Sequence, residues 1–308
     1  MPNRPPPILI AGSGAMACLF AARLSAYASV TLLGTWPEGL AALQRVGVRL
    51  QAGGLETRHT VRVTSDPLDC RGANFALVLV KSWQTRRVAE KLAECLTPAG
   101  VALTLQNGLG NLETLQETLG AERAALGVTT TGATLLGPGL VRVGGTGPTH
   151  VGRHPRLDPY VPLLRQAGFE VEVGGDVESL LWGKLAVNVA INPLTALLRV
   201  VNGALLEDPN ARALMGEAAR EAAAVAGAIG VDLPYLDPAA QAEEVARRTA
   251  ANRSSMLQDM LRGAPTEIDA INGAVADGGD RLGVATPVNR SLWHLVRSAV
   301  SIGGSELR

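Results

Sequence analysis

The stretch from Trp182 to Pro193, WGKLAVNVAINP, carries polar side chains at a spacing that suits a reaction site. Read as a helix, it places Lys184, Asn188 and Asn192 along one face, with mostly apolar residues between them. A helix that is apolar on its other sides is buried, so the polar stripe must face a ligand or polar neighbours. The stripe is ~12 Å long, enough to line a small substrate. Two interpretations stay open: a ligand-binding face, or side chains that merely hydrogen-bond to neighbouring loops.

A glycine-rich turn stands near the start of the chain, between two apolar runs. Ile8–Ala11 is the first run, GSGAMA follows at positions 12–17, a helical pattern continues to Leu24, and Val30–Leu33 is the second run. Strand, glycine turn, helix and strand in this order are the setting of the dinucleotide-binding motif G-x-G-x-x-G/A. Free N–H groups at the helix N-terminus would bind the pyrophosphate. We expect the cofactor to contact Gly12, Ser13, Gly14, Ala15 and Met16.

Further apolar runs alternate with helical patterns, which predicts an α/β fold with a doubly wound sheet. Phe75–Val80 and Val101–Leu105 read as buried parallel strands, with a helix over about 84–95 between them. Ligands on such sheets bind beyond the carboxyl ends of the strands, where Lys81 and Asn107 stand. Ordinary loop polarity is the alternative for both residues, and an Asn-Gly pair also suits a plain tight turn.

A composition shift at Gly174-Gly175-Asp176 divides the chain. Before it, residues 48–63 read as a hairpin and 124–151 as irregular strands that close the sheet. After it there is little strand pattern, and we expect helices over about 177–200, 209–230, 238–262, 266–282 and 287–300. The sequence therefore predicts a Rossmann-type domain at residues 1–175 and an all-helical domain at residues 176–308.

The polar residues of the helical part read as structural by spacing alone. Pro193 lacks an N–H and disfavours helical geometry at Asn192, so a kink is expected there. Ser254 and Ser255 read as ordinary polar groups on a helix surface. Residues 266–269 read as a helix start that leaves Glu267 on a solvated face.

Composition limits which kinds of partner, and which cellular compartment, we expect for this chain. Lys plus Arg and Asp plus Glu each number 28, so no basic excess points to nucleic acid or an anionic membrane. The three cysteines, in no paired spacing, fit free thiols in a reducing compartment. The start shows no signal-peptide pattern, and the apolar segment 185–206 is too interrupted for a membrane span. The four histidines form no zinc motif. We expect a cytoplasmic protein without a metal, nucleic-acid or membrane partner.

With these residues in view, the chain resembles the ketopantoate reductase (2-dehydropantoate 2-reductase) family over nearly its whole length. The resemblance is carried by five motifs in the family's order, which are GSGAMA, VKSWQT, LQNGLG, LWGKLAVNVAINPLTAL and SSMLQDMLRGAPTEIDAING. It implies a Rossmann domain followed by a helical domain, with the active site in the cleft between them. It also implies NADPH-dependent reduction of the keto group of ketopantoate to D-pantoate, in the pathway to pantothenate and coenzyme A.

The resemblance also implies roles for single residues. Lys184 corresponds to the general acid that protonates the carbonyl oxygen, and Glu267 to a second catalytic group that binds the substrate hydroxyl. The positions that match substrate contacts are Asn188, Asn192 and Ser255, and those that match contacts to both cofactor and substrate are Lys81 and Asn107. For Glu267 and Ser255 these roles replace the structural interpretation above.

One departure concerns the cofactor. The family often has an Arg after the second strand to hold the 2′-phosphate, whereas this chain continues as Gly34-Thr35-Trp36, with neither that Arg nor the Asp that favours NAD. NADPH is expected by resemblance, with Thr35 in the place of the Arg. Two other functions stay open: reduction of another small branched 2-oxo acid, and a non-catalytic sensor that binds NADP(H). The sequence leaves the oligomeric state open, a homodimer being one option.

Overall fold

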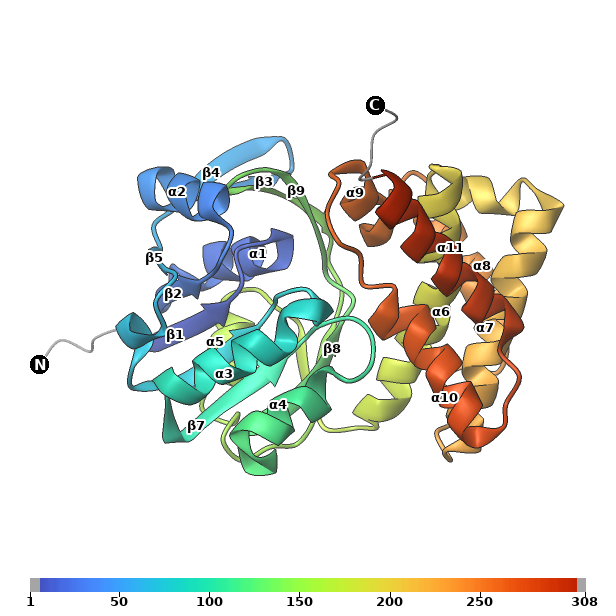
Figure 1. The fold of residues 1–308 in the computed structure, drawn as a ribbon. Coiled ribbons are helices and arrows are strands. Elements are labelled where there is room, and N and C mark those ends of the chain that lie inside the picture. The colour runs from blue at the N-terminus through green and yellow to red at the C-terminus, as the bar shows by residue number, and fades with distance from the viewer. Residues whose placement is uncertain (1–5, 304–308) are drawn as a thin grey trace, which may run out of the picture. The chain divides into compact units, whose positions relative to one another are not determined.

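The computed structural model of the chain describes residues 6–303. These residues form two compact units (Figure 1). Unit 1 comprises the chain up to Gln106 together with Asn111–Val177. Unit 2 comprises the short segment Asn107–Gly110 and the chain from Glu178 onward. Each unit is described by itself below.

Unit 1 is built on an eight-stranded sheet in the order β12-β11-β8-β7-β6-β1-β2-β5. Neighbouring strands are parallel throughout, except that β11 runs antiparallel to β8. The strands are β1 (Pro7–Ala11), β2 (Ser29–Leu33), β5 (Arg62–Thr64), β6 (Ala73–Val78), β7 (Leu96–Thr104), β8 (Ala124–Thr129), β11 (Thr149–Val151) and β12 (Val171–Val173). The predicted doubly wound sheet is confirmed.

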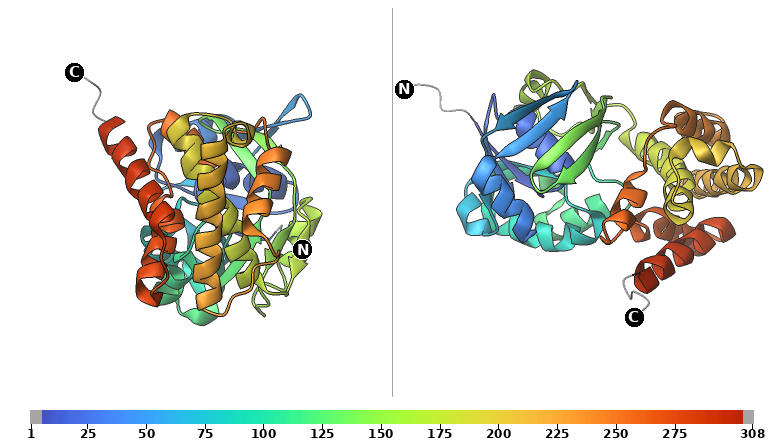
Figure 2. Two further views of the ribbon diagram at one scale, coloured as in Figure 1. Left: turned by 90° about the vertical axis from the view of Figure 1, so that its right-hand side faces the viewer. Right: turned by 90° about the horizontal axis from the view of Figure 1, so that it is seen from above.

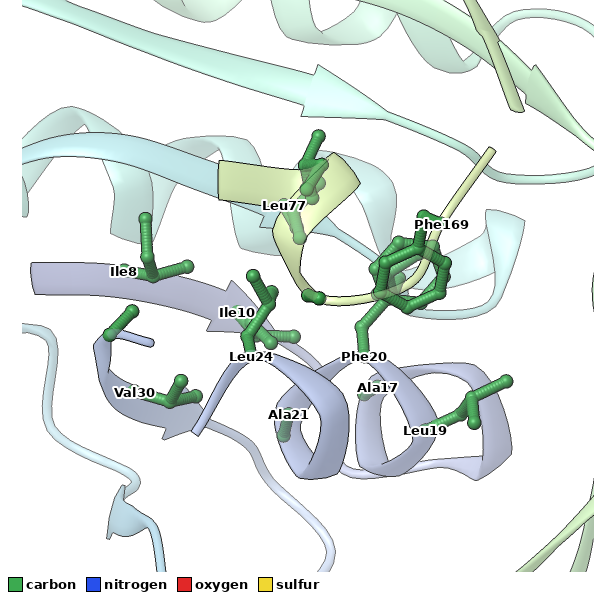
Figure 3. Packing of buried hydrophobic residues seen from close by; sticks show 14 of the residues in the cluster. Ile8, Ile10, Ala17, Leu19, Phe20, Ala21, Leu24, Val30, Leu77 and Phe169 are labelled. Atoms are coloured by element: carbon green, nitrogen blue, oxygen red, sulfur yellow. The ribbon is translucent and has the colours of Figure 1, made fainter. Parts of the chain in front are cut away.

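Helices cover both faces of this sheet, as the alternation of side chains along β1 requires. Ile8 and Ile10 enter one core with α1 (Ala15–Leu24) and α5 (Val161–Gln166), whereas Leu9 enters the other core. The second core contains apolar side chains of α3 (Thr85–Cys95) and α4 (Asn111–Leu119). Figure 3 shows the first core, where the rings of Phe20 and Phe169 stack with their centroids 4.0 Å apart.

The expectation that residues 124–151 close the main sheet is only partly right. A second sheet has the order β4-β3-β10-β9. It joins the predicted hairpin of β3 (Val48–Ala52) and β4 (Leu55–His59) to β9 (Gly132–Gly137) and β10 (Leu140–Gly145), which lie beside it in the right-hand view of Figure 2. Its Val48 and Val141 share a core with α1, a helix buried at most of its positions. Since the main sheet covers only one side of α1, the second sheet buries the other.

The described part of unit 2 consists of helices without strands (Figures 1 and 2). The α-helices are α6 (Val177–Leu198), α7 (Pro209–Ala228), α8 (Pro238–Arg248), α9 (Ser255–Leu261), α10 (Ala274–Leu282) and α11 (Pro287–Gly303). Two shorter turns are the 3-10 helix η4 (Asn202–Leu206) and the π-helical turn η5 (Asp269–Gly273). The helix α2 (Pro37–Val46) of unit 1 completes the set of longer helices.

The prediction of one helix over 238–262 is wrong, because the chain leaves helical geometry between α8 and α9. In this interval, the amides of Asn202 and Gly203 in η4 donate to the carbonyls of Asn252 and Ala250, at 2.9 and 3.0 Å. Those carbonyls are therefore used in tertiary hydrogen bonds rather than in a continuing helix.

Helix α6 is the central element of unit 2. By length and composition alone it could cross a membrane, yet 72% of its most apolar 18-residue window is buried inside the structure. Its apolar residues share one core with side chains of α7, α8, α9 and α11. A core helix of this kind has to find a partner for every polar group it carries.

Candidate active site

The glycine turn lies between β1 and α1, at the carboxyl edge of the main sheet. The amide of Gly12 donates to the Leu33 carbonyl at the end of β2, at 2.8 Å. Gly12 has φ +130°, and a Cβ there would lie 3.0 Å from the Leu79 carbonyl oxygen. Gly14 is the N-cap of α1, and a Cβ at this position would meet nothing within 4 Å. The turn thus needs glycine at the first position for the backbone, and leaves open space at the second.

Open space beside the first turn of a helix fits a dinucleotide, because its N–H groups and positive dipole end attract phosphate. Ser13 is buried, while Ala15 and Met16, the first residues of α1, are half-buried. The first turn of α1 contains no acidic side chain. These residues can therefore hold the pyrophosphate of a bound nucleotide.

The end of β2 offers little charge to a cofactor. Thr35 is exposed and follows Gly34, whose amide donates to the Thr64 carbonyl of β5 at 3.0 Å. Between Gly34 and Leu40 the only charged side chain is Glu38 in the first turn of α2. For a 2′-phosphate this segment offers the Thr35 hydroxyl, the indole N–H of Trp36 and backbone N–H groups, but no cationic side chain.

A buried polar network supports the loop that carries Lys81. The half-buried Lys81 is the N-cap of a short 3-10 turn, η2 (Ser82–Gln84). The Gln106 amide, in a side chain that is 7% exposed, donates to the Val80 carbonyl at 3.0 Å and to the Thr85 hydroxyl at 2.8 Å. Thr85 in turn donates to the buried Asn111, at 2.8 Å. Gln106 therefore fixes the backbone beside Lys81, a role that the sequence did not indicate.

Asn107 follows this network directly but belongs to unit 2. Two residues later, the Leu109 amide donates to the Ala270 carbonyl in η5, at 2.9 Å. The segment with Asn107 is therefore tied to the turn that follows Glu267.

Lys184 and Glu267 interact within unit 2. Lys184 is half-buried on α6, and desolvation lowers the pKa of its ammonium group from the ordinary 10.5 to about 8, while the Glu267 carboxylate acts in the opposite direction. Glu267 is 5% exposed, so the solvated position that spacing alone predicts for it is wrong. An ammonium group with a pKa near 8 is charged at neutral pH and can still give up its proton.

The predicted polar stripe lies on a single helix, since Lys184, the half-buried Asn188 and the buried Asn192 all belong to α6. The expectation that Asn192 leaves helical geometry before Pro193 is wrong, because α6 continues to Leu198.

The physical reason for this continuity lies in a side chain of another segment. Proline has no N–H for the carbonyl four residues earlier, which here belongs to Val189. The side-chain amide of Asn272 donates to that carbonyl instead, at 3.0 Å.

Ser255 begins α9 and is half-buried. The preceding Ser254 caps the helix by accepting from the Leu257 amide at 3.0 Å. Ser254 also accepts from the Thr195 hydroxyl at 2.7 Å, and Thr195 lies three residues after Asn192 on α6. This buried pair ties the start of α9 to α6. Ser254 is thus a cap rather than a surface group, as serine before an apolar run can indicate.

The structure therefore arranges the predicted site residues in two sets. In unit 1, Gly12–Met16, Thr35 and Lys81 follow the carboxyl ends of neighbouring parallel strands. In unit 2, α6 carries the three stripe residues, and Asn107 is joined to the segment of Glu267. Among residues 6–303, no group of three or more His, Cys, Asp or Glu side chains could hold a metal ion. The two sets thus contain a glycine turn that could bind a nucleotide, before α1, and a titratable proton donor, Lys184.

Two family profiles together cover most of the chain. Residues 8–156 match the family described as "Ketopantoate reductase PanE/ApbA". Residues 176–300 match the family described as "Ketopantoate reductase PanE/ApbA C terminal".

The chain is also similar to individual proteins over nearly its whole length. It is 37% identical to the 2-dehydropantoate 2-reductase of Archaeoglobus fulgidus, over 96% of this chain and 98% of that protein. It is likewise 37% identical to the 2-dehydropantoate 2-reductase of Halobacterium salinarum, over 95% and 98% of the two chains.

Solved structures share the fold. The PanE/ApbA family ketopantoate reductase of Ralstonia eutropha JMP134 gives a TM-score of 0.89 at 33% identity, over 96% of this chain and 98% of that chain. A ternary structure of D-mandelate dehydrogenase with NADH and anilino(oxo)acetate gives 0.90 at 24% identity, over 96% and 98%.

The open space at Gly14 predicts that Gly14→Val folds normally but binds a nicotinamide dinucleotide such as NADPH at least ~10-fold more weakly, because the branched side chain would occupy the space open to a pyrophosphate. Gly12→Ala is the matched contrast, since its positive φ and the nearby Leu79 carbonyl should cost about 1–3 kcal/mol of folding stability. Thermal unfolding and NADPH fluorescence titration measure both. Normal NADPH affinity in a folded Gly14→Val would contradict this placement of the cofactor.

Proposed function

This chain belongs to the ketopantoate reductase family, and we propose that it reduces the keto group of 2-dehydropantoate to give D-pantoate, with NADPH as the reductant. The observation that carries the proposal is the Lys184 amine on a core helix, its pKa lowered to about 8 by burial, beside the buried Glu267. A nucleotide-binding turn supplies the other half of a hydride-transfer site.

NADPH, when bound at the turn before α1, supplies the hydride that adds to the keto carbon. Negative charge then develops on the carbonyl oxygen, and the Lys184 ammonium donates a proton to it. The products are the alcohol, the oxidised nucleotide and the neutral Lys184 amine, which takes a new proton from solvent before the next turnover. A pKa near 8 suits both halves of this cycle at neutral pH.

We assign the remaining residues to substrate binding. Asn188 and Asn192 offer amide donors and acceptors along the same face of α6 as Lys184. Glu267 accepts a hydrogen bond from the substrate hydroxyl and keeps the Lys184 proton in place. The Ser255 hydroxyl, together with Lys81 and Asn107, completes the polar groups, the last two also reaching the cofactor.

The preference for NADPH rests on the family rather than on a cationic side chain at the end of β2. Thr35 is exposed there and can donate one hydroxyl hydrogen bond to a 2′-phosphate. The D-mandelate dehydrogenase that shares this fold was solved with NADH. We therefore propose a preference for NADPH that is smaller than an Arg site gives.

A non-catalytic sensor would have no use for a buried amine with a lowered pKa, so the reductase is the better account of Lys184. A different small branched 2-oxo acid would use the same groups, and the assay that follows separates it from ketopantoate.

The first prediction of this assignment concerns cofactor choice. Purified protein should oxidise NADPH on addition of ketopantoate, faster at limiting concentration than it oxidises NADH. Thr35→Asp should turn the preference toward NADH by at least ~10-fold, because a carboxylate repels the 2′-phosphate and accepts a bond from a free ribose hydroxyl. The fall in absorbance of the reduced nicotinamide measures the rate with NADPH and with NADH, for the wild type and for Thr35→Asp. Thr114→Asp, on α4 of unit 1, is the control for added charge. An unchanged ratio in Thr35→Asp would place recognition elsewhere.

The second prediction concerns pH. Because Lys184 must be protonated to act, kcat/KM should fall with a slope of one as the pH rises through about 8. Glu267 holds the pKa of Lys184 up, so Glu267→Gln should move this fall to lower pH, whatever its effect on the maximum rate. Glu178→Gln, an exposed carboxylate on the same helix, is the control. A fall that stays in place or moves to higher pH in Glu267→Gln would refute the pairing.

The third prediction separates proton donation from charge. Lys184→Arg keeps the charge but cannot donate a proton near neutral pH, so kcat should fall by ~10²–10⁴-fold. Lys184→Ala should lose kcat and bind ketopantoate more weakly as well. Lys91→Arg is the matched control, because Lys91 donates to the Ser65 carbonyl at 2.8 Å in unit 1 and has no part in the proposed chemistry. Near-normal turnover of Lys184→Arg under saturation would return Lys184 to a binding role.

A further inference from the structure

Pro193 interrupts the backbone hydrogen bonding of α6 within the segment that carries the proposed site residues. The carbonyl of Val189 lacks its usual donor four residues on, because that donor would be the N–H that residue 193 does not have. Val189 directly follows Asn188 and lies between Lys184 and Asn192 on the helix. In the buried core an unpaired carbonyl would cost about 1–3 kcal/mol.

The side chain of Asn272 supplies a donor to this carbonyl and is itself fully enclosed. Asn272 is 0% exposed, and its two amide protons go to the Val189 carbonyl at 3.0 Å and the Asn289 side-chain oxygen at 2.9 Å. Asn289, also 0% exposed, donates to the Ala218 carbonyl at 3.0 Å and to Glu221 at 2.8 Å. A chain of hydrogen bonds thus runs from α6 through η5 and α11 to α7.

The turn that presents Asn272 begins two residues after Glu267. In η5 the backbone takes a π-helical turn, with the Gly273 amide donating to the Ile268 carbonyl at 3.0 Å, and the Ile271 amide donates back to the Glu267 carbonyl at 3.1 Å. On the outer side, the Trp293 indole donates to Asp269 at 2.6 Å. Asn272 joins this turn to the middle of α6. The position of the Glu267 backbone is therefore fixed with respect to the helix that carries Lys184. Single π-helical turns are often found at functional sites.

We propose that Asn272 is a positioning residue for the reaction. It replaces the hydrogen bond that Pro193 cannot make and thereby holds α6 against η5. The distance and orientation between Lys184 and Glu267 are fixed as a result. The proline is what makes the Val189 carbonyl depend on Asn272, because an ordinary residue at 193 would donate to that carbonyl from within the helix, beside the Asn272 amide. This inference rests on the proposed reductase function for its kinetic part only.

A double-mutant cycle tests the coupling. Asn272→Leu keeps the side-chain volume but removes both donors, and it should lower kcat by ~10–100-fold through misplacement of the reacting groups. It should also lower Tm by about 5–10 °C. NADPH affinity should stay within about 3-fold, because the nucleotide turn lies in unit 1. Pro193→Ala supplies the missing N–H, so it should restore most of the Tm of Asn272→Leu while changing the wild type little. It should leave kcat low in the double variant, because an intrahelical bond does not tie α6 to η5.

Asn289→Leu is the matched control. It breaks the same network at the next link but leaves the bond from Asn272 to Val189 in place. It should lower Tm yet keep kcat within about 3-fold, and Pro193→Ala should not rescue its stability. A loss of kcat in Asn289→Leu equal to that in Asn272→Leu would show that the network acts only through stability, and would overturn the proposal.

Two further outcomes are decisive. If Asn272→Leu alone does not fold, the double variant with Pro193→Ala should fold, and its failure to do so would also overturn the proposal. If the wild type does not reduce ketopantoate, the proposed function fails, while the Tm values of the cycle still decide whether Asn272 and Pro193 are coupled. Independent, additive Tm losses would refute that coupling.

Discussion

The Lys184 ammonium group lies on a helix whose other side chains form the core of unit 2, and desolvation there lowers its pKa to about 8. A shift from 10.5 to about 8 corresponds to roughly 3 kcal/mol against folding at neutral pH. Because the pKa is lower in the folded state, this cost is complete below about pH 8 and fades as the pH rises toward 10.5. This cost already includes the opposing effect of Glu267, and the apolar packing around α6 has to outweigh it.

Burying the amine on a helix has a second consequence, which concerns the backbone. Every carbonyl of a core helix needs a donor, and Pro193 removes one. The Asn272 amide makes up the loss and also donates to Asn289, which in turn donates to Glu221, while the Asn272 side-chain oxygen is buried without a hydrogen-bond partner among the described residues. A side chain that satisfies a helix carbonyl from outside also fixes the distance between two segments, which an intrahelical bond does not. In unit 2, the side-chain amide of Asn272 thus holds η5 against α6.

The features that the sequence could predict are those determined by local periodicity. The stripe of α6 and the turn Gly12–Met16 follow from spacing within about twelve residues, and both occur where they are expected. The support of these residues depends on partners far along the chain, which periodicity does not contain. Gln106 contacts Val80 across 26 positions, Thr195 contacts Ser254 across 59, and Asn272 contacts Val189 across 83. The break between α8 and α9 has the same origin, because η4 supplies the competing hydrogen bonds.

In the proposed reaction, the two units divide the chemistry according to what each kind of structure can supply. Backbone N–H groups at the start of a helix bind phosphate well, but they do not give up protons near neutral pH. Proton donation requires a titratable side chain whose position is fixed to a fraction of an ångström. Lys81 stands on a loop whose backbone depends on the Gln106 network, whereas Lys184 stands eight residues inside a helix of 22 residues. The more rigid support and the lowered pKa belong to the same residue, because the packing around α6 that holds Lys184 in place also desolvates its amine.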